Sequence, residues 1–173
     1  PRYVVNRYMD LLFGKTRSQS SSSLMPMIAF PAPEGEWIDP SLNCVDDVFS
    51  IRSGYNPHEY RWGDGAATIL DFYLEADDRP YPSAVGTGQT VTLRVAIKFH
   101  TDLVRPTFGV TIKTKTGVTV YGANSETLKC EDFMSKGRKD SVIVAEAVFC
   151  CRLAPGDYFI SVGVVTRLGE DVS

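Results

Sequence analysis

The sequence predicts an antiparallel β-sandwich, and three observations support this fold class. Apolar and polar residues alternate in several segments from residue 60 onward. Turn signals rich in glycine, proline or asparagine separate these segments. No helical periodicity interrupts them. Strands that recur with turns between them and without intervening helices are typical of all-β sandwiches.

The size and composition are those of an ordinary globular protein. The chain has 173 residues, of which 43% are apolar and 23% charged, enough for one domain with a core or for one domain plus a tail. The net charge of -3 shows no excess of basic residues, so we do not expect a nucleic-acid partner. No apolar run approaches the ~18 residues that would span a bilayer. The opening "PRYVVNRYMD" carries charges where a signal peptide would be apolar, and it lacks an initiator Met, so we expect a fragment of a longer protein.

The N-terminal region is predicted to lie outside the sandwich. Residues 3–13 place apolar side chains at helical spacing and precede Gly14, which predicts a short helix. The serine-rich stretch "KTRSQSSSS" follows and resembles a linker. We therefore expect residues 1–23 to be the end of a preceding domain and its linker, and residues 24–173 to form the β-sandwich, with core strands in 60–173. Before residue 60 we expect loops, with one short strand or helical turn around residues 45–51.

Two predicted strands begin the core. In "ATILDFYLEA" the apolar period slips once, which indicates a β-bulge. "TVTLRVAIKFH" alternates cleanly, so we expect one buried face and one hydrated face. The buried face comprises Val91, Leu93, Val95, Ile97 and Phe99, and the other face Thr92, Arg94, Ala96, Lys98 and His100.

Three further segments complete the predicted sheets. "TFGVTIKTKTGVTVYG" indicates two strands joined at a "KTG" turn, with Phe108, Val110 and Ile112 inward. "DSVIVAEAVFCCRL" predicts a long strand, which an "APG" turn connects to "DYFISVGVVTR". Tyr158, just after that turn, is interpreted as a corner or core residue.

The search for catalytic and metal chemistry points to a protein that is not an enzyme and needs no cofactor. Two histidines, His58 and His100, exclude a multi-histidine metal site within one chain. No nucleophile elbow or P-loop is present. Paired carboxylates at 46–47 and 77–78 are better explained by solvated turns than by glycosidase chemistry. The four cysteines form no C-x-x-C pair, and we interpret them as reduced thiols, which favours the cytoplasm.

A polar sheet face is the remaining candidate for function. Arg94, Lys98 and His100, with Tyr73 on a neighbouring strand and Tyr121 nearby, suit a sugar ligand. Aromatic rings stack on the C–H faces of a pyranose, while charged groups bond its hydroxyls. The alternative is an ordinary solvated sheet face.

Several segments together resemble a known family. "NPHEYRWGDGAATI", "GQTVTLRVAIKFHTDLVRPTFGVTIKTKTGVTVYGANSET" and "LAPGDYFISVGV" are similar, in order and spacing, to the C-terminal carbohydrate-binding domain of Wzt. Wzt is the nucleotide-binding subunit of ABC transporters that export O-antigen polysaccharide. The resemblance covers roughly residues 56–167. "RYVVNRYMDLLFGK" resembles the end of the preceding ATPase domain, but the Walker motifs of that domain are absent.

The resemblance implies a jelly-roll or immunoglobulin-like sandwich that recognises finished glycan in the cytoplasm, often through a modified non-reducing end. It also implies a homodimer in which a C-terminal strand beyond Ser173 is exchanged. Within "NPHEYRWGDGAATI", Asn56-Pro57 is a turn signal and Gly63 and Gly65 supply backbone freedom. Trp62, with Arg61 beside it, either fixes the entry to the first strand or lines the glycan site. Asn124 likewise either stabilises a turn or contacts a sugar.

These observations lead to one hypothesis and two rivals. The hypothesis is a non-catalytic module that binds O-antigen polysaccharide for export, through Trp62, Tyr73, Arg94, Lys98, His100, Tyr121 and Asn124. One rival is an oligomerisation or docking module of the transporter, which acts without glycan binding. The other is a glycosidase or isomerase on a jelly-roll scaffold, against which the histidine count argues.

Overall fold

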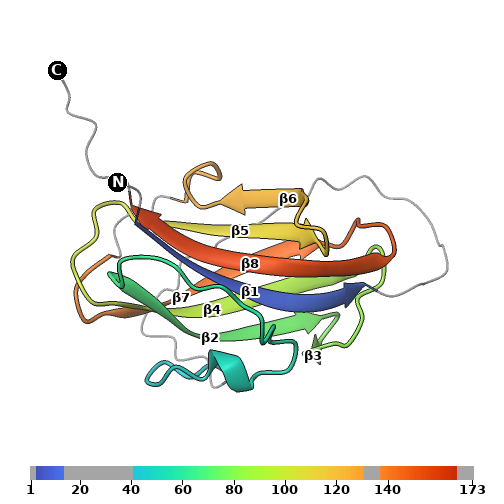
Figure 1. Cartoon of the computed structure of the whole chain (residues 1–173), viewed down its shortest axis with the longest axis horizontal. Helices are drawn as coiled ribbons and strands as arrows, with labels where there is room; N and C mark the ends of the chain where they lie inside the picture. The colour runs from blue at the N-terminus through green and yellow to red at the C-terminus, as the bar shows by residue number, and fades with distance from the viewer. Residues whose placement is uncertain (1–2, 14–40, 131–136, 167–173) are drawn as a thin grey trace.

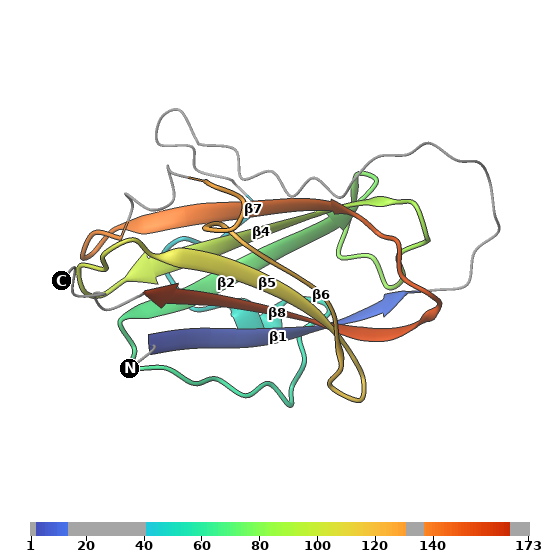
Figure 2. The same ribbon diagram turned by 90° about the horizontal axis from the view of Figure 1, so that it is seen from above.

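Two four-stranded antiparallel sheets pack face to face, as Figures 1 and 2 show. The computed structural model of the chain describes residues 3–13, 41–130 and 137–166. One sheet has the order β1-β8-β5-β6, comprising Tyr3–Phe13, Gly156–Thr166, Thr107–Thr114 and Thr119–Asn124. The other has the order β3-β2-β4-β7, comprising Arg79–Pro80, Ala67–Ala76, Thr90–Phe99 and Val142–Cys150. The predicted antiparallel sandwich is therefore confirmed.

The core lies between the two sheets and follows the predicted alternation. All five alternate residues of β4 from Val91 to Phe99 are fully buried. Phe108, Val110 and Ile112 of β5 meet them from the other sheet, as the sequence predicted. Tyr158 is 9% exposed and its hydroxyl donates a hydrogen bond to the Ala154 carbonyl at 3.0 Å, which confirms its interpretation as a corner or core residue.

The predicted bulge lies in β2. Its register against β4 shifts between Ile69 and Asp71, so Leu70 is the extra residue. The carbonyl of Leu70 accepts a hydrogen bond from the Val48 amide at 2.9 Å. The bulge thus turns a backbone acceptor away from the sheet ladder and uses it to hold the preceding segment.

A short 3-10 helix, η1 (Phe49–Ile51), lies beside β2 at the lower edge of the sandwich in Figure 1. The sequence placed one helical turn or strand at residues 45–51, and the helical turn is confirmed. Phe49 is fully buried, with its ring centroid 4.5 Å from that of Phe72. This turn therefore contributes to the core ahead of the first strand of its sheet.

The helix predicted for residues 3–13 is wrong. Tyr3–Phe13 forms β1, which pairs with β8 along its whole length, from Tyr3 opposite Thr166 to Phe13 opposite Gly156. A helix this short is marginal in water, whereas the strand satisfies the backbone groups along one side of β8. The linker expected at residues 15–23 lies outside the described residues, and the division of the chain after residue 23 stays a prediction.

Gly137 allows a close approach of two loops and provides a stability test. The Leu103 amide donates to the Gly137 carbonyl at 2.7 Å, and a methyl group at Gly137 would collide with the Leu103 carbonyl oxygen. We expect Gly137→Ala to lower the free energy of unfolding by about 1–3 kcal/mol, measured by urea denaturation. Gly109→Ala is the control, because its added carbon would have no neighbour nearer than 3.8 Å. Equal effects of the two substitutions would contradict this account.

Candidate functional site

A row of polar and aromatic side chains crosses the outer face of the β3-β2-β4-β7 sheet. Tyr73 of β2 is opposite Arg94 of β4, which is opposite Glu146 of β7. The Nε of Arg94 donates to Oε2 of Glu146 at 2.6 Å, and its guanidinium carbon lies 5.6 Å from the Tyr73 ring centroid. Cross-strand pairing and the cation–π contact thus hold Arg94 between an aromatic ring and a carboxylate.

Tyr81 extends this row beyond β2. Its ring meets that of Tyr73 edge-on, with centroids 5.5 Å apart. Its hydroxyl donates to the Phe72 carbonyl at 2.9 Å, and its backbone has a positive φ of 44°. A bulky residue rarely adopts this conformation, so the surrounding contacts must hold it there. The result is a fixed, half-buried pair of tyrosine rings beside a cation.

Lys98 and His100 form a second group on the same face. Lys98 is opposite Thr68 of β2, whose hydroxyl lies 2.9 Å from Nε2 of His100. His100 is exposed just after β4, where its amide donates to the Ala66 carbonyl at 2.8 Å. Lys98 lies four positions after Arg94 along β4, a span of about 13 Å.

The face between these two groups is not hydrated, which differs from the predicted continuous wet face. Ala96 and its cross-strand neighbour Asp71 are both fully buried. Asp71 accepts hydrogen bonds from the Asn43 amide at 2.7 Å and from Nε of Arg52 at 2.8 Å. The segment before β2 therefore covers the Asp71 carboxylate, and the polar face is split into two separate groups.

The loop that leads into β2 contains Trp62, which is 42% exposed. Next to it, Arg61 makes ion pairs with Asp47 at 2.8 Å and with Glu59 at 2.6 Å. Burial raises the pKa of the Glu59 carboxyl, although a hydrogen bond from Tyr55 acts in the opposite direction. Arg61 therefore holds this loop in place, in line with the structural interpretation of the segment, and Trp62 is displayed beside it.

Gly63 and Gly65 have positive φ values of 146° and 76°, so the predicted need for backbone freedom is confirmed. The Asn56 side chain accepts a hydrogen bond from the His58 amide at 2.9 Å, as its turn signal indicated. The loop is thus shaped by local turn chemistry before it joins the sheet.

Tyr121 and Asn124 lie on the other sheet, away from the face that carries Arg94. Both belong to β6, at the edge of the β1-β8-β5-β6 sheet. Asn124 accepts a hydrogen bond from the Thr127 amide at 2.8 Å, which stabilises a turn. Tyr121 faces inward and stacks against Phe149 of β7, with ring centroids 6.4 Å apart and planes 24° apart. The predicted proximity of Tyr121 to the wet face is therefore wrong, because the two lie on different sheets.

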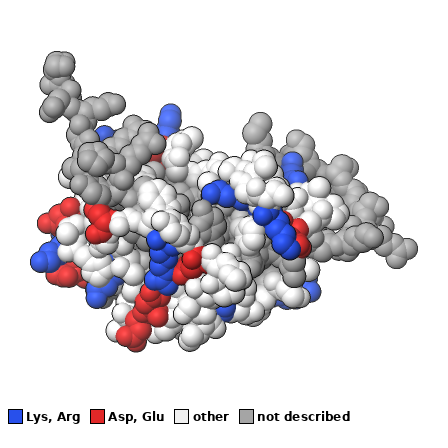
Figure 3. Space-filling model, in the orientation of Figure 1, with Lys and Arg blue, Asp and Glu red and all other residues white. Residues whose placement is uncertain are grey.

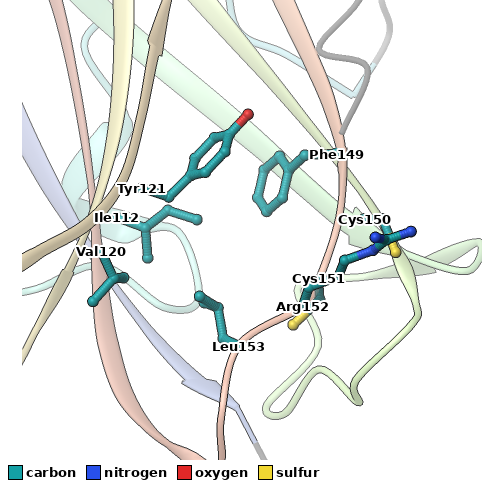
Figure 4. Close-up of a pocket in the computed structure, with 8 residues that line it drawn as sticks. All are labelled: Ile112, Val120, Tyr121, Phe149, Cys150, Cys151, Arg152 and Leu153. Atoms are coloured by element: carbon teal, nitrogen blue, oxygen red, sulfur yellow. The ribbon is translucent and has the colours of Figure 1, made fainter. Parts of the chain in front are cut away.

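A cavity of about 160 Å³ opens beside Tyr121, where β6 and β7 face each other across the open edge of the sandwich (Figure 4). Most of its lining is apolar. The lining includes Ile112, Val120, Tyr121, Phe149, Cys151 and Leu153. Burial raises the pKa of the Tyr121 hydroxyl.

Charge is mixed on the face that Figure 3 displays. Acidic and basic side chains lie next to one another there, and neither sign dominates. No group of three or more His, Cys, Asp or Glu side chains suited to a metal ion occurs in the described part of the chain. Among those same residues, no helix is long and apolar enough to cross a bilayer.

Sequence reasoning missed Glu146, Tyr81, Phe149 and Leu153. Alternation along each strand places Glu146 on the outer face and Phe149 on the inner face, but the partner strand of each is not encoded locally. Tyr81 follows a proline in a turn-rich stretch, and no periodicity marks it. A contact that joins two sheets leaves no local signal in the sequence.

The fold and these surfaces define a two-sheet β-sandwich domain with a polar and aromatic outer face and an apolar cavity between two edge strands. The chain belongs to the Wzt C-terminal domain family, whose model matches residues 58–172. It is similar to the crystal structure of the C-terminal domain of wzt, with 29% sequence identity and a TM-score of 0.65. That similarity covers 73% of this chain and 76% of the other. No curated protein matches. Family membership supports a role in an O-antigen ABC transporter.

Proposed function

We propose that this domain binds O-antigen polysaccharide without altering it and selects finished glycan for export by the ABC transporter. The family membership carries this proposal. The modified non-reducing end of the glycan is the proposed recognition element, since it distinguishes a finished chain from an unfinished one. The proposed location is the cytoplasmic side of the inner membrane. There the full-length protein would form a homodimer by exchange of a C-terminal strand. It would also bind the membrane subunit of the transporter.

The row containing Tyr81, Tyr73, Arg94 and Glu146 supports sugar binding by its chemistry. Half-buried tyrosine rings offer flat apolar surface, and the adjacent ion pair offers both a donor and an acceptor for hydroxyls. These side chains already contact one another, so little conformational entropy is lost on binding. Lys98, His100 and Trp62 would contact sugars further along the chain.

Titration calorimetry with O-polysaccharides that differ only at the non-reducing end tests this proposal. We expect measurable heat with one terminus and none with the others. A folded protein that binds none of these polysaccharides would overturn glycan recognition.

Tyr73→Ala is expected to weaken polysaccharide binding about tenfold, equivalent to about 1.4 kcal/mol, because the sugar loses its stacking surface. The measurement is the dissociation constant in the same titration. Lys115→Ala, at an exposed position on the turn after β5, serves as the control. Unchanged affinity in folded Tyr73→Ala would remove this row from the site.

A docking module is the second candidate, and exposed apolar side chains near two edge strands favour it. Val118 and Val120 at β6 are 59% and 43% exposed, and Val142 on β7 is 36% exposed. Edge strands can pair with another chain through their outer backbone groups. Binding to the membrane subunit or to a second copy, with no response to any polysaccharide, would establish this alternative.

A further inference from the structure

The tyrosine pair on the outer face has a guanidinium group at each end. Arg94 contacts Tyr73, with its guanidinium carbon 5.6 Å from the ring centroid. Arg52 contacts Tyr81, at 6.0 Å by the same measure. We propose that Arg52 is a positioning residue of the sugar site, which holds the Tyr81 ring and, through it, the Tyr73 ring. The inference rests on the proposed function and adds to it a residue from outside the row.

The Arg52 guanidinium is itself fixed by hydrogen bonds. Its Nε donates to Oδ1 of the buried Asp71 at 2.8 Å, and its Nη2 donates to Oδ2 at 2.5 Å. The same Nη2 lies 3.3 Å from the Ser41 carbonyl oxygen, to which it also donates. Hydrogen bonding to Asp71 raises the pKa of Arg52, so the group remains a cation. A planar guanidinium bound at two positions of one carboxylate has a single orientation, so it meets Tyr81 as a preorganised group.

Tyr81 has a conformation that its surroundings must hold in place. Its φ of 44° is rare for a bulky residue. The Tyr81 amide donates to the Leu74 carbonyl at 2.7 Å, and its hydroxyl donates to the Phe72 carbonyl at 2.9 Å. These two bonds attach both ends of the residue to the edge of β2. The ring between them is the part that the Arg52 cation contacts.

The Tyr81 ring transmits its position to the outer face. It meets the Phe72 ring edge-on, with centroids 5.8 Å apart, and the Tyr73 ring edge-on, with centroids 5.5 Å apart. Successive side chains of a strand point to opposite faces, so Tyr81 contacts one residue from each face of β2. A rotation of the Tyr81 ring would therefore remove an edge-to-face contact from Tyr73.

The role of Arg52 differs from that of Arg94. The hydrogen bonds of Arg52 point to Asp71 and Ser41, and its side chain is 27% exposed. Arg94 lies within the row, between a tyrosine ring and a carboxylate. Arg52 would thus act on a sugar through the order of the tyrosine rings. Rings that are already ordered lose less conformational entropy when a ligand binds.

The first experiment measures the coupling of the rings without a ligand. The protein is labelled with 3-fluorotyrosine, and Tyr73→Phe identifies the fluorine NMR signal of Tyr73. Arg52→Lys keeps a cation for Asp71 but lacks the planar fork. We expect it to shift or broaden the Tyr73 signal in the parent protein and to leave that signal unchanged in a Tyr81→Gly background, because glycine accepts the positive φ and removes the ring. An unchanged Tyr73 signal in the parent protein, or the same change in both backgrounds, would overturn the inference.

The second experiment relates this coupling to binding. By titration calorimetry, Arg52→Lys is expected to weaken binding of the O-polysaccharide that gives heat with the parent protein by about fivefold. Arg79→Gln is the matched control, because it removes a cation from an exposed position two residues before Tyr81 and should leave the affinity unchanged. Urea denaturation confirms that both variants are folded under the conditions of the titration.

The outcomes separate this inference from the proposed function. If Arg52→Lys binds as tightly as the parent while Tyr73→Ala binds weakly, Arg52 has no positioning role, although the row remains the sugar site. If Arg79→Gln weakens binding as much as Arg52→Lys, the loss of positive charge explains both effects and the inference fails. If the parent binds no polysaccharide, the proposed function fails, and the fluorine signals alone decide whether Arg52 holds the tyrosine pair.

Discussion

Replacing Phe49 by alanine is expected to lower the free energy of unfolding by about 3–5 kcal/mol. The Phe49 side chain is fully buried. Its ring centroid lies 4.5 Å from that of Phe72 and 6.1 Å from that of Tyr55. Its removal leaves a cavity at the edge of the sandwich that rigid strands cannot fill. Urea denaturation followed by tryptophan fluorescence measures the loss.

Ile51→Ala is the matched control, since Ile51 lies in the same helical turn and is 77% exposed. We expect it to change stability by less than about 0.5 kcal/mol. If the two substitutions lower the free energy of unfolding equally, η1 does not contribute to the core, and the segment before β2 is dispensable for folding.

Replacing Asp71 by alanine is the second large effect, with an expected loss of about 3 kcal/mol. The Asp71 carboxylate is fully buried, and it accepts from both Nε and Nη2 of Arg52, at 2.8 and 2.5 Å, as well as from the Asn43 amide. Alanine would leave these donors without their acceptor. The Arg52 side chain is 27% exposed, so water recovers part of the loss, which sets the estimate at the low end for buried pairs.

A double-mutant cycle isolates this interaction. Arg52→Ala and the Asp71→Ala, Arg52→Ala double variant complete the cycle, and the double variant should cost less than the sum of the single ones. Asp46→Ala, at an exposed position of the same segment, should be nearly neutral. Strict additivity of Asp71→Ala and Arg52→Ala would show that the pair contributes no coupling energy.

Phe49, Arg52 and Asn43 all precede residue 58, where the family match begins. They nevertheless fill the core or bond a buried carboxylate of β2. The folded unit therefore includes the segment from residue 41 as well as the matched region. This segment also buries the centre of the outer face, which is why the polar residues of β4 do not form one continuous surface.

The error over residues 3–13 has a physical cause. Their apolar spacing fits a helix, but valine, tyrosine and phenylalanine also favour strands. Local periodicity does not reveal that β8 has an open side along which eleven residues can pair. Backbone pairing with a distant segment decided the outcome, and local propensity could not anticipate it.

For the candidate site too, some residues were placed correctly by local alternation, whereas others depended on strand order. Alternation placed Arg94 and Lys98 on an outer face and Phe108, Val110 and Ile112 in the core, because side chains of a strand alternate between its two faces. The grouping of Tyr121 with the Arg94 face failed, because the assignment of β6 to the opposite sheet depends on strand order.

The sequence by itself determined the fold class, most of the strands, the bulge in β2 and the resemblance to the Wzt C-terminal domain, since each follows from local residue patterns and their order along the chain. Only the tertiary structure decided that residues 3–13 pair with β8, that Arg52 covers Asp71, and that Tyr121 meets Phe149 beside a cavity. These three features join segments far apart in sequence. Their free energy comes from pairing and burial between sheets, which no local pattern of residue types specifies.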